Sequence, residues 1–191
     1  MRKVIFQMMV SLDGYFEGPN HELDWHGPVV DAEYNEYAAE FLDSIDTLVF
    51  GRVTYQLMAG YWPSKEALKD DPVIAAKMNS LKKVVFSRTL DNAEWENSRL
   101  AKDNPAAEVW KLKNLPGKDI AIFGSSDLSL ELIDAGLIDE YRIMVNPIVL
   151  GAGKPLFRGI KKRLGLELFK TRIMKSGLAI LYYRAKKADG G

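Results

Sequence analysis

The sequence contains no cysteine, and this absence excludes several kinds of chemistry. Disulfides, thiolate-bound zinc, iron–sulfur clusters and cysteine nucleophiles all require a residue that the 191-residue chain lacks. An excess of one charge is also missing, because 26 lysines and arginines balance 26 aspartates and glutamates. Nucleic acid is therefore not an expected partner, since binding to its phosphates depends on a basic surface.

The chain has no long hydrophobic run near its start. The first apolar segment follows Met1-Arg2-Lys3 and is broken by Ser11 and Asp13. It is therefore much shorter than the roughly 20 residues of a membrane span, and it does not fit a signal peptide. We expect a cytoplasmic protein with no membrane partner, one α/β domain over residues 1–187 and a disordered tail at 188–191.

Glycine and proline residues divide the chain into alternating strand-like and helix-like segments. The predicted strands of the first part are 3–10, 47–50, 83–86 and 119–123. The predicted helices are 31–42, a segment from about Val53, 72–81 and 126–135. The later strands are predicted at 141–145, 166–174 and 178–185. This order predicts a mixed, mostly parallel sheet with helices on both faces and a C-terminal antiparallel hairpin.

Polar residues or glycines follow four of these strands. The four corners are Ser11-Leu12-Asp13-Gly14, Gly51-Arg52-Val53-Thr54, Ser87-Arg88-Thr89 and Gly124-Ser125-Ser126. Ligands of open α/β sheets gather at the carboxyl ends of parallel strands. We therefore expect the four corners to converge on one site, although each alone is ordinary turn or cap chemistry.

The chemistry of three corners suits a dinucleotide. Helix starts after Gly51 and Gly124 offer backbone N–H groups to a diphosphate, and Arg52 adds a positive charge. Ser87 and Arg88 suit a phosphate monoester such as the 2′-phosphate of NADP. The Gly-x-Gly-x-x-Gly fingerprint is absent, which disfavours an ordinary Rossmann site.

Five motifs occur in an order that resembles one family. They are Ser-Leu-Asp-Gly at 11–14, Gly-Arg-Val-Thr-Tyr at 51–55, Val-Phe-Ser-Arg-Thr-Leu at 85–90, and the segments 135–141 and 146–157. Together they resemble the stand-alone reductase domain of the riboflavin-biosynthesis deaminase-reductase C-terminal family, which has a dihydrofolate reductase-like fold. The resemblance covers about Lys3 to Ala185. It implies NADPH as cofactor, hydride transfer as the reaction and a homodimer as the assembly.

The resemblance also implies roles for individual residues. The implied cofactor contacts are Gly51, Arg52, Val53 and Thr54, then Ser87 and Arg88 at the adenosine ribose, and Gly124, Ser125 and Ser126 at the diphosphate. The family often has a second glycine where this chain has Ser125, and a serine tolerates fewer backbone conformations. Asp13 matches an acidic residue near the nicotinamide and substrate, where it could act as a catalytic proton relay. An Asx-turn at Asp13 is the alternative.

The expected substrate is a small heterocycle of pteridine or pyrimidine type, as in folate or riboflavin metabolism. Phe16, Trp25 and Tyr55 are candidate walls for a flat ligand, although such aromatics often cover a core. Carboxylates that could bind a pterin are Asp31, Glu33 and Glu36, which fit a helix cap and a solvated face better.

One loop raises a metal site as an alternative. It holds His21, Glu22, Asp24 and His26, but their spacing matches no standard ligand set. We expect two exposed histidines and no metal.

Two functions remain open at this point. The first is an NADPH-dependent reductase, which Asp13 and the aromatic loop favour because a pure binding protein would not need them. The alternative is a non-catalytic dinucleotide-binding sensor or dimeric interaction module on the same fold. For the homodimer, Phe169, Ile180 and Tyr182 lie in the predicted hairpin at a sheet edge, where apolar side chains favour pairing with a second copy.

Overall fold

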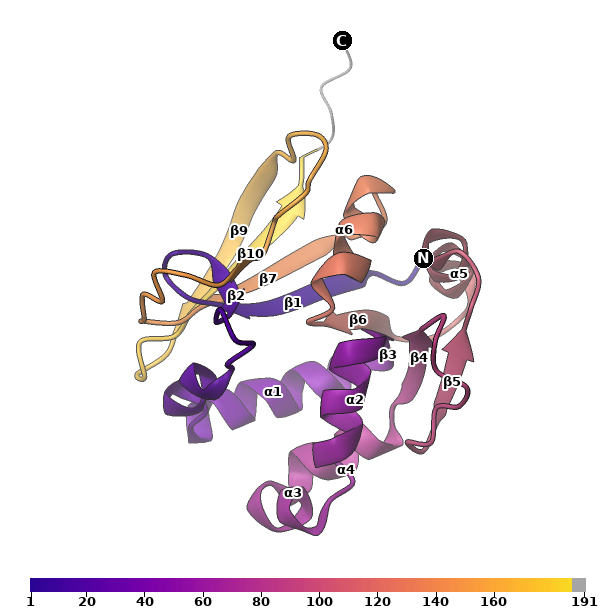
Figure 1. The fold of residues 1–191 in the computed structure, drawn as a ribbon, viewed down its shortest axis with the longest axis horizontal. Helices are drawn as coiled ribbons and strands as arrows, with labels where there is room; N and C mark the ends of the chain where they lie inside the picture. Colours follow the sequence, from indigo (N-terminus) through magenta and orange to yellow (C-terminus); the bar gives the residue numbers. More distant parts are fainter. Residues whose placement is uncertain (187–191) are drawn as a thin grey trace.

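The computed structural model describes residues 1–186 and is organised around an eight-stranded sheet (Figure 1). Its strands are β1 (Val4–Val10), β3 (Ile45–Gly51), β4 (Lys82–Phe86), β5 (Ser98–Ala101), β6 (Asp119–Phe123), β7 (Glu140–Val145), β9 (Leu166–Ile173) and β10 (Ala179–Ala185). A separate antiparallel pair consists of β2 (Tyr15–Glu17) and β8 (Lys154–Pro155). The tail expected at 188–191 lies outside the described residues.

The strand order is β5-β4-β3-β6-β1-β7-β10-β9. Neighbours from β5 through to β7 pair in parallel, whereas β10 runs antiparallel to both β7 and β9. The mixed, mostly parallel sheet with a C-terminal antiparallel hairpin is therefore confirmed. Its topology brings the carboxyl ends of β3, β4 and β6 to one edge, where ligands bind in open α/β sheets.

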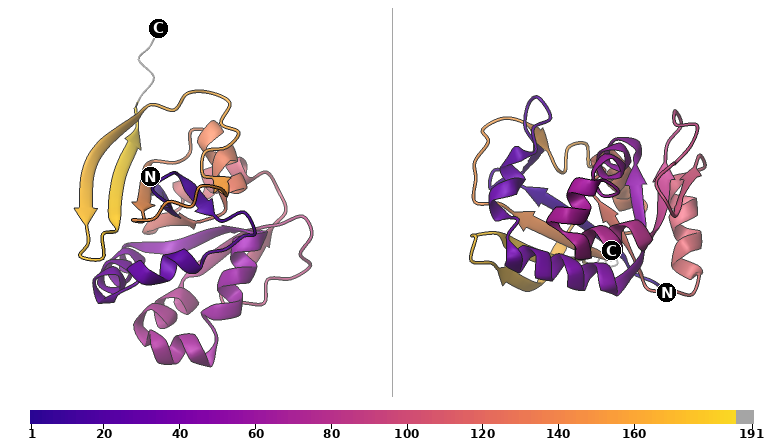
Figure 2. Two further views of the ribbon diagram at one scale, coloured as in Figure 1. Left: turned by 60° about the vertical axis from the view of Figure 1, so that its left-hand side comes forward. Right: turned by 90° about the horizontal axis from the view of Figure 1, so that it is seen from below.

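Helices cover both faces of the sheet (Figures 1 and 2). They are η1 (Asp24–Val29), α1 (Ala32–Ser44), α2 (Arg52–Tyr61), α3 (Lys65–Asp70), α4 (Pro72–Ser80), α5 (Pro105–Asn114) and α6 (Ser126–Asp134). One buried cluster joins the sheet to α1, α2 and α4, and a second joins its other face to α5 and α6. Within residues 1–186, every helix is too short or too polar to cross a membrane.

The side chains of β1 explain why helices pack on both faces of the sheet. Val4 and Phe6 point into one cluster, and Ile5 between them points into the other. A strand with apolar residues at successive positions is stable only when helices shield both faces.

Asp31 is the residue that precedes α1, and its side chain accepts the N–H of Tyr34 at 2.9 Å. Asp31 is therefore a helix cap.

The C-terminal hairpin changes the surface expected for dimer formation. Ile180 and Tyr182 are buried within the chain, at 0% and 4% exposure, so they are not an open edge. The hairpin strand at the edge of the sheet is β9, on which Phe169 and Ile173 are 37% and 73% exposed. The exposed large apolar side chains of this hairpin therefore lie on β9 and not on β10.

Candidate active site

Three of the four polar corners meet in one cleft of about 500 Å³. The predicted cofactor residues that line it are Gly51, Arg52, Val53, Thr54, Ser87, Arg88, Ser125 and Ser126. Gly124 lines an adjoining cavity, described below. Three strands that end at the same sheet edge thus bring together residues from distant parts of the sequence.

Two helices begin at the cleft. Gly51 is the N-cap of α2 and Ser125 is the N-cap of α6, and neither residue makes a side-chain capping bond. The first N–H groups of both helices are therefore available to an anion, which the helix dipoles also favour. Arg52 is exposed at the start of α2 and donates to Gln56 Oε1 at 2.9 Å.

The turn before α6 is held by hydroxyl groups. Gly124 and Ser125 have φ values of +61° and +58°. Ser125 N donates to Thr54 Oγ1 at 3.1 Å, and Gly51 N donates to Ser125 Oγ at 2.7 Å. These two bonds offset the roughly 1–2 kcal/mol that left-handed backbone costs a residue with a side chain. The serine in place of a second glycine is therefore accommodated by its neighbours on β3 and α2.

A basic group at the far end of the cleft is absent from the sequence-based prediction. Lys102 lines the cleft with Ser87 and Arg88 and follows β5 directly. Ser87 Oγ accepts the N–H groups of Thr89 at 3.2 Å and Leu90 at 3.0 Å, so it shapes this turn. The sequence did not predict Lys102 because β5 has only four residues and no clear apolar alternation. Had β5 been predicted, Lys102 would have been a candidate, since ligands bind at the carboxyl ends of parallel strands.

An apolar cavity of about 240 Å³ adjoins the cleft. The two spaces share five wall residues, namely Phe16, Glu17, Val53, Thr54 and Ser125. Most of the remaining wall is methionine, aromatic and aliphatic side chains from β1, α1, α2 and α4. A polar cleft with cationic groups therefore continues into a small apolar cavity.

Glu17 is a carboxylate that borders both spaces. Its Oε1 lies 3.0 Å from His21 Nδ1 and 3.8 Å from Lys154 Nζ, and its side chain is 15% exposed. The β2–β8 pair places Glu17 opposite Lys154. Glu17 is absent from the sequence-based prediction because β2, with three residues, is too short to produce a clear alternating pattern.

His26 borders the cavity with an unpaired nitrogen. Its Nε2 is buried and has no hydrogen-bond partner among residues 1–186. Burial lowers the pKa of His26 to about 4, against a smaller opposing effect of Asp24. The imidazole is therefore neutral at pH 7. The expectation of two exposed histidines is correct for His21, whose side chain is 80% exposed, and wrong for His26.

His26 is expected to make the free energy of unfolding fall as the pH drops from 6.5 toward 4. Below 6.5 the unfolded chain binds a proton on His26, while the folded chain stays neutral until the pH approaches about 4. This difference amounts to roughly 3 kcal/mol. Urea denaturation of the wild type and of His26→Phe across this range checks it. The variant should lack this part of the pH dependence, and parallel curves would contradict the assignment.

Asp13 lies outside both the cleft and the cavity. Its exposed carboxylate accepts the N–H of Leu150 at 3.1 Å through Oδ1 and of Gly151 at 2.8 Å through Oδ2. The side chain therefore ties the loop after β1 to the loop after β7. Asp13 is absent from the residues that line either space, and both of its oxygens accept backbone N–H groups, so its catalytic role stays a prediction.

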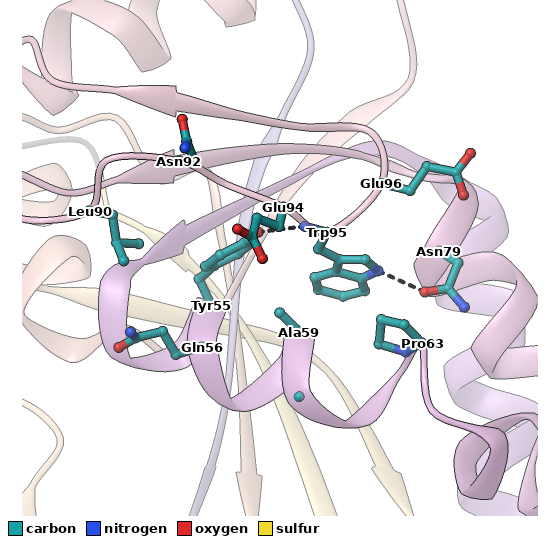
Figure 3. A pocket seen from close by; sticks show the side chains of 11 residues that line it. Tyr55, Gln56, Ala59, Pro63, Asn79, Leu90, Asn92, Glu94, Trp95 and Glu96 are labelled. Carbon is teal, nitrogen blue, oxygen red and sulfur yellow. Dashed lines mark hydrogen bonds between the residues drawn. The ribbon is translucent and has the colours of Figure 1, made fainter.

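Two of the three predicted aromatic walls also lie elsewhere. Tyr55 is 4% exposed, and its hydroxyl accepts the N–H of Trp95 at 2.9 Å beside a separate groove of about 740 Å³ (Figure 3). Trp25 is buried in η1, where its Nε1 donates to the carbonyl oxygen of Glu22 at 3.1 Å. Trp25 is a packing residue and Tyr55 lines the separate groove, so of the three predicted walls only Phe16 lines the cavity.

Comparison with known proteins identifies the family. Residues 2–180 match the model of the RibD C-terminal domain. The uncharacterized protein YyaP of Bacillus subtilis (strain 168) is 38% identical over 182 residues, which cover 95% of this chain and 94% of YyaP.

Two solved structures share the fold. The diaminohydroxyphosphoribosylaminopyrimidine deaminase/5-amino-6-(5-phosphoribosylamino)uracil reductase of Thermotoga maritima has a TM-score of 0.68 at 12% identity, covering 97% of this chain and 57% of that one. Dihydrofolate reductase of Enterococcus faecalis, complexed with NADP(H), has a TM-score of 0.64 at 16% identity and 97% coverage of both chains. The chain therefore belongs to the RibD C-terminal domain family and has the dihydrofolate reductase-like fold.

Proposed function

We propose that this protein is an NADPH-dependent reductase that transfers hydride to a small heterocyclic substrate of pteridine or pyrimidine type. The observation that carries the proposal is the continuity of the cleft and the cavity, which share five wall residues. A dinucleotide in the cleft would meet a ring in the cavity at this junction. Membership of a family of riboflavin-type reductases supports an oxidoreductase.

The donor groups of the cleft fit a phosphorylated dinucleotide. The N-termini of α2 and α6 suit the diphosphate, and Arg88 and Lys102 suit a 2′-phosphate at the far end. When bound, NADPH would supply a hydride, which carries two electrons, to a substrate carbon, and the substrate must also gain one proton. Phe16 and Val53 at the junction would help exclude water from the reacting atoms.

Glu17 takes the place of Asp13 in this proposal as the group that moves the proton. It borders both the cleft and the cavity, and His21 and Lys154 hold its carboxylate in position. Because His21 is largely exposed, it links Glu17 to solvent, from which the proton can be replaced.

NADPH is expected to bind at least about tenfold more tightly than NADH, because a charged contact to the 2′-phosphate contributes roughly 1.5–3 kcal/mol. Arg88→Ala should erase most of this preference and leave NADH binding nearly unchanged. Arg99→Ala is the matched control, since Arg99 is an exposed arginine that pairs with Glu108 and does not line the cleft. Calorimetric titration measures both affinities, and equal loss for the two cofactors would make Arg88 structural.

One assay distinguishes the reductase from the alternative function, a non-catalytic dinucleotide-binding sensor or interaction module. A reductase oxidises NADPH only when a substrate is present, so a panel of pteridines, pyrimidines and related rings should include at least one that is turned over. Tight NADPH binding without turnover across the panel would support the alternative.

We also propose a homodimer formed through β9. This edge strand has unpaired backbone groups and exposes Leu168, Phe169 and Ile173. Light scattering at micromolar concentration should give about twice the chain mass of 21.5 kDa, and Ile173→Lys should shift the mass toward that of one chain. A wild-type mass of one chain would rule out the dimer.

A further inference from the structure

The cavity beside the cleft carries almost no charge. Among the described residues that line it, Glu17 carries the one carboxyl group, and none is lysine or arginine. A phosphate or carboxylate that entered would lose its hydration without gaining a cation, and Glu17 would repel it. The cavity therefore disfavours anionic ligands.

The walls of the cavity suit a flat apolar ring. Five of the chain's seven methionines line it, namely Met8, Met9, Met58, Met78 and Met144. Methionine side chains adapt to irregular shapes and make favourable contacts with aromatic rings. Phe16, Phe41, Trp62 and Phe123 add aromatic surface. The volume of about 240 Å³ lies below the roughly 300–1,000 Å³ typical of drug-sized ligands, which indicates a ligand of about two fused rings.

Polar but uncharged groups also border the cavity. The buried Nε2 of His26 has no partner among residues 1–186, so a ligand atom would satisfy it. Burial raises the pKa of Tyr34 to about 12, which keeps its phenol neutral. Gln7 Oε1 accepts the hydroxyl of Tyr37 at 2.5 Å, which orients the Gln7 amide. These groups can recognise the heteroatoms of a neutral ring.

We propose that the substrate is a small, flat, uncharged ring compound without a phosphate group, and that a hydrogen bond from His26 Nε2 orients it in the cavity. This inference rests on the proposed reductase function. It separates this chain from the Thermotoga maritima enzyme, whose name specifies a phosphoribosylamino-uracil. No described residue that lines this cavity would neutralise such a phosphate.

Calorimetric titration of the wild-type chain with three probes tests the substrate class. The probes are quinoxaline, quinoxaline-2-carboxylate and uridine 5′-monophosphate, each added with and without saturating NADP⁺. Quinoxaline should bind at least about tenfold more tightly than either anion. Equal or tighter binding of an anion, or no binding of quinoxaline, would overturn the inference. The NADP⁺ titration is separate, so failure of the cofactor site is distinguishable from failure of the cavity.

His26→Phe tests the proposed hydrogen bond. The variant keeps a ring of similar size and removes Nε2, so quinoxaline affinity should fall roughly three- to tenfold. Naphthalene has the same shape without ring nitrogens, and its affinity should not fall. At pH 7 the free energy of unfolding should not decrease, because the change removes an unsatisfied buried nitrogen. Equal loss for both probes would overturn the role of His26.

Leu57→Lys tests whether charge sets the selectivity. Leu57 lies on α2, borders the cavity and is 54% exposed, so a lysine is tolerated there. The new cation should improve the affinity for quinoxaline-2-carboxylate relative to quinoxaline by roughly two- to fivefold. Leu57→Gln is the neutral matched control. An affinity ratio that is the same in both variants would contradict exclusion by charge.

Discussion

Gly124→Val is expected to weaken NADPH binding about a hundredfold or more, which corresponds to a loss of roughly 2.7 kcal/mol. Gly124 has a φ of +61°, which a β-branched residue adopts only with strain. A Cβ there would also lie 3.2 Å from both Oγ1 and Cγ2 of Thr54. Displacing Thr54 removes the acceptor for Ser125 N, so the turns before α2 and α6 would both shift. Calorimetric titration with NADPH measures the loss.

A matched control separates crowding of the cleft from backbone strain. Gly136 at the end of α6 has a similar φ of +66°, but a Cβ there would meet nothing within 4 Å. Gly136→Val should therefore be destabilised by strain alone and bind NADPH normally when folded, as circular dichroism can verify. If Gly124→Val does not fold, Gly124→Ala replaces it in the test, because alanine places a Cβ against Thr54 with a smaller side chain. Normal NADPH binding by a folded Gly124 variant would remove this turn from the site.

Glu17→Gln is expected to lower turnover by roughly 10²–10⁴-fold, the usual contribution of a positioned acid or base. Glutamine keeps the size of the side chain but cannot move a proton between solvent and the junction. NADPH affinity should stay nearly unchanged, so the loss should appear in kcat. Steady-state kinetics with any substrate from the panel, together with a cofactor titration, measures both.

Asp13→Asn serves as the matched carboxylate control. Because Asp13 binds the N–H groups of Leu150 and Gly151 outside the cleft, the substitution should lower the melting temperature slightly and preserve turnover. The opposite pattern, an inactive Asp13→Asn and an active Glu17→Gln, would restore the role that the sequence suggested for Asp13.

Most of the sheet was predictable, because clear local signals mark its strands with the exception of β5. Apolar runs such as 3–10 and 119–123 end at glycine or polar residues, and each is followed by a turn or a helix start. The short elements were harder. No helix was predicted at α5, although Asn104 caps it by accepting the N–H of Ala107 at 3.1 Å and Pro105 follows the cap.

The site was predictable only in its polar half. The carboxyl ends of parallel strands lie at one edge of a sheet, and this rule predicts that the residues after β3, β4 and β6 lie close together. These residues do line one cleft. The cavity follows no such rule, because Leu23, Tyr34, Met58 and Phe123 come from four separate elements or loops. Asp13 shows the limit of the rule. It follows a parallel strand but does not line the cleft, and its carboxylate accepts two N–H groups from the loop after β7.

Calorimetric titration of the wild-type chain with NADPH and NADH tests the central claim most directly, because it measures whether the cleft is a dinucleotide site. The account predicts one NADPH bound per chain, at an affinity at least about tenfold higher than that of NADH. The absence of saturable NADPH binding, or equal affinity for the two cofactors, would contradict it.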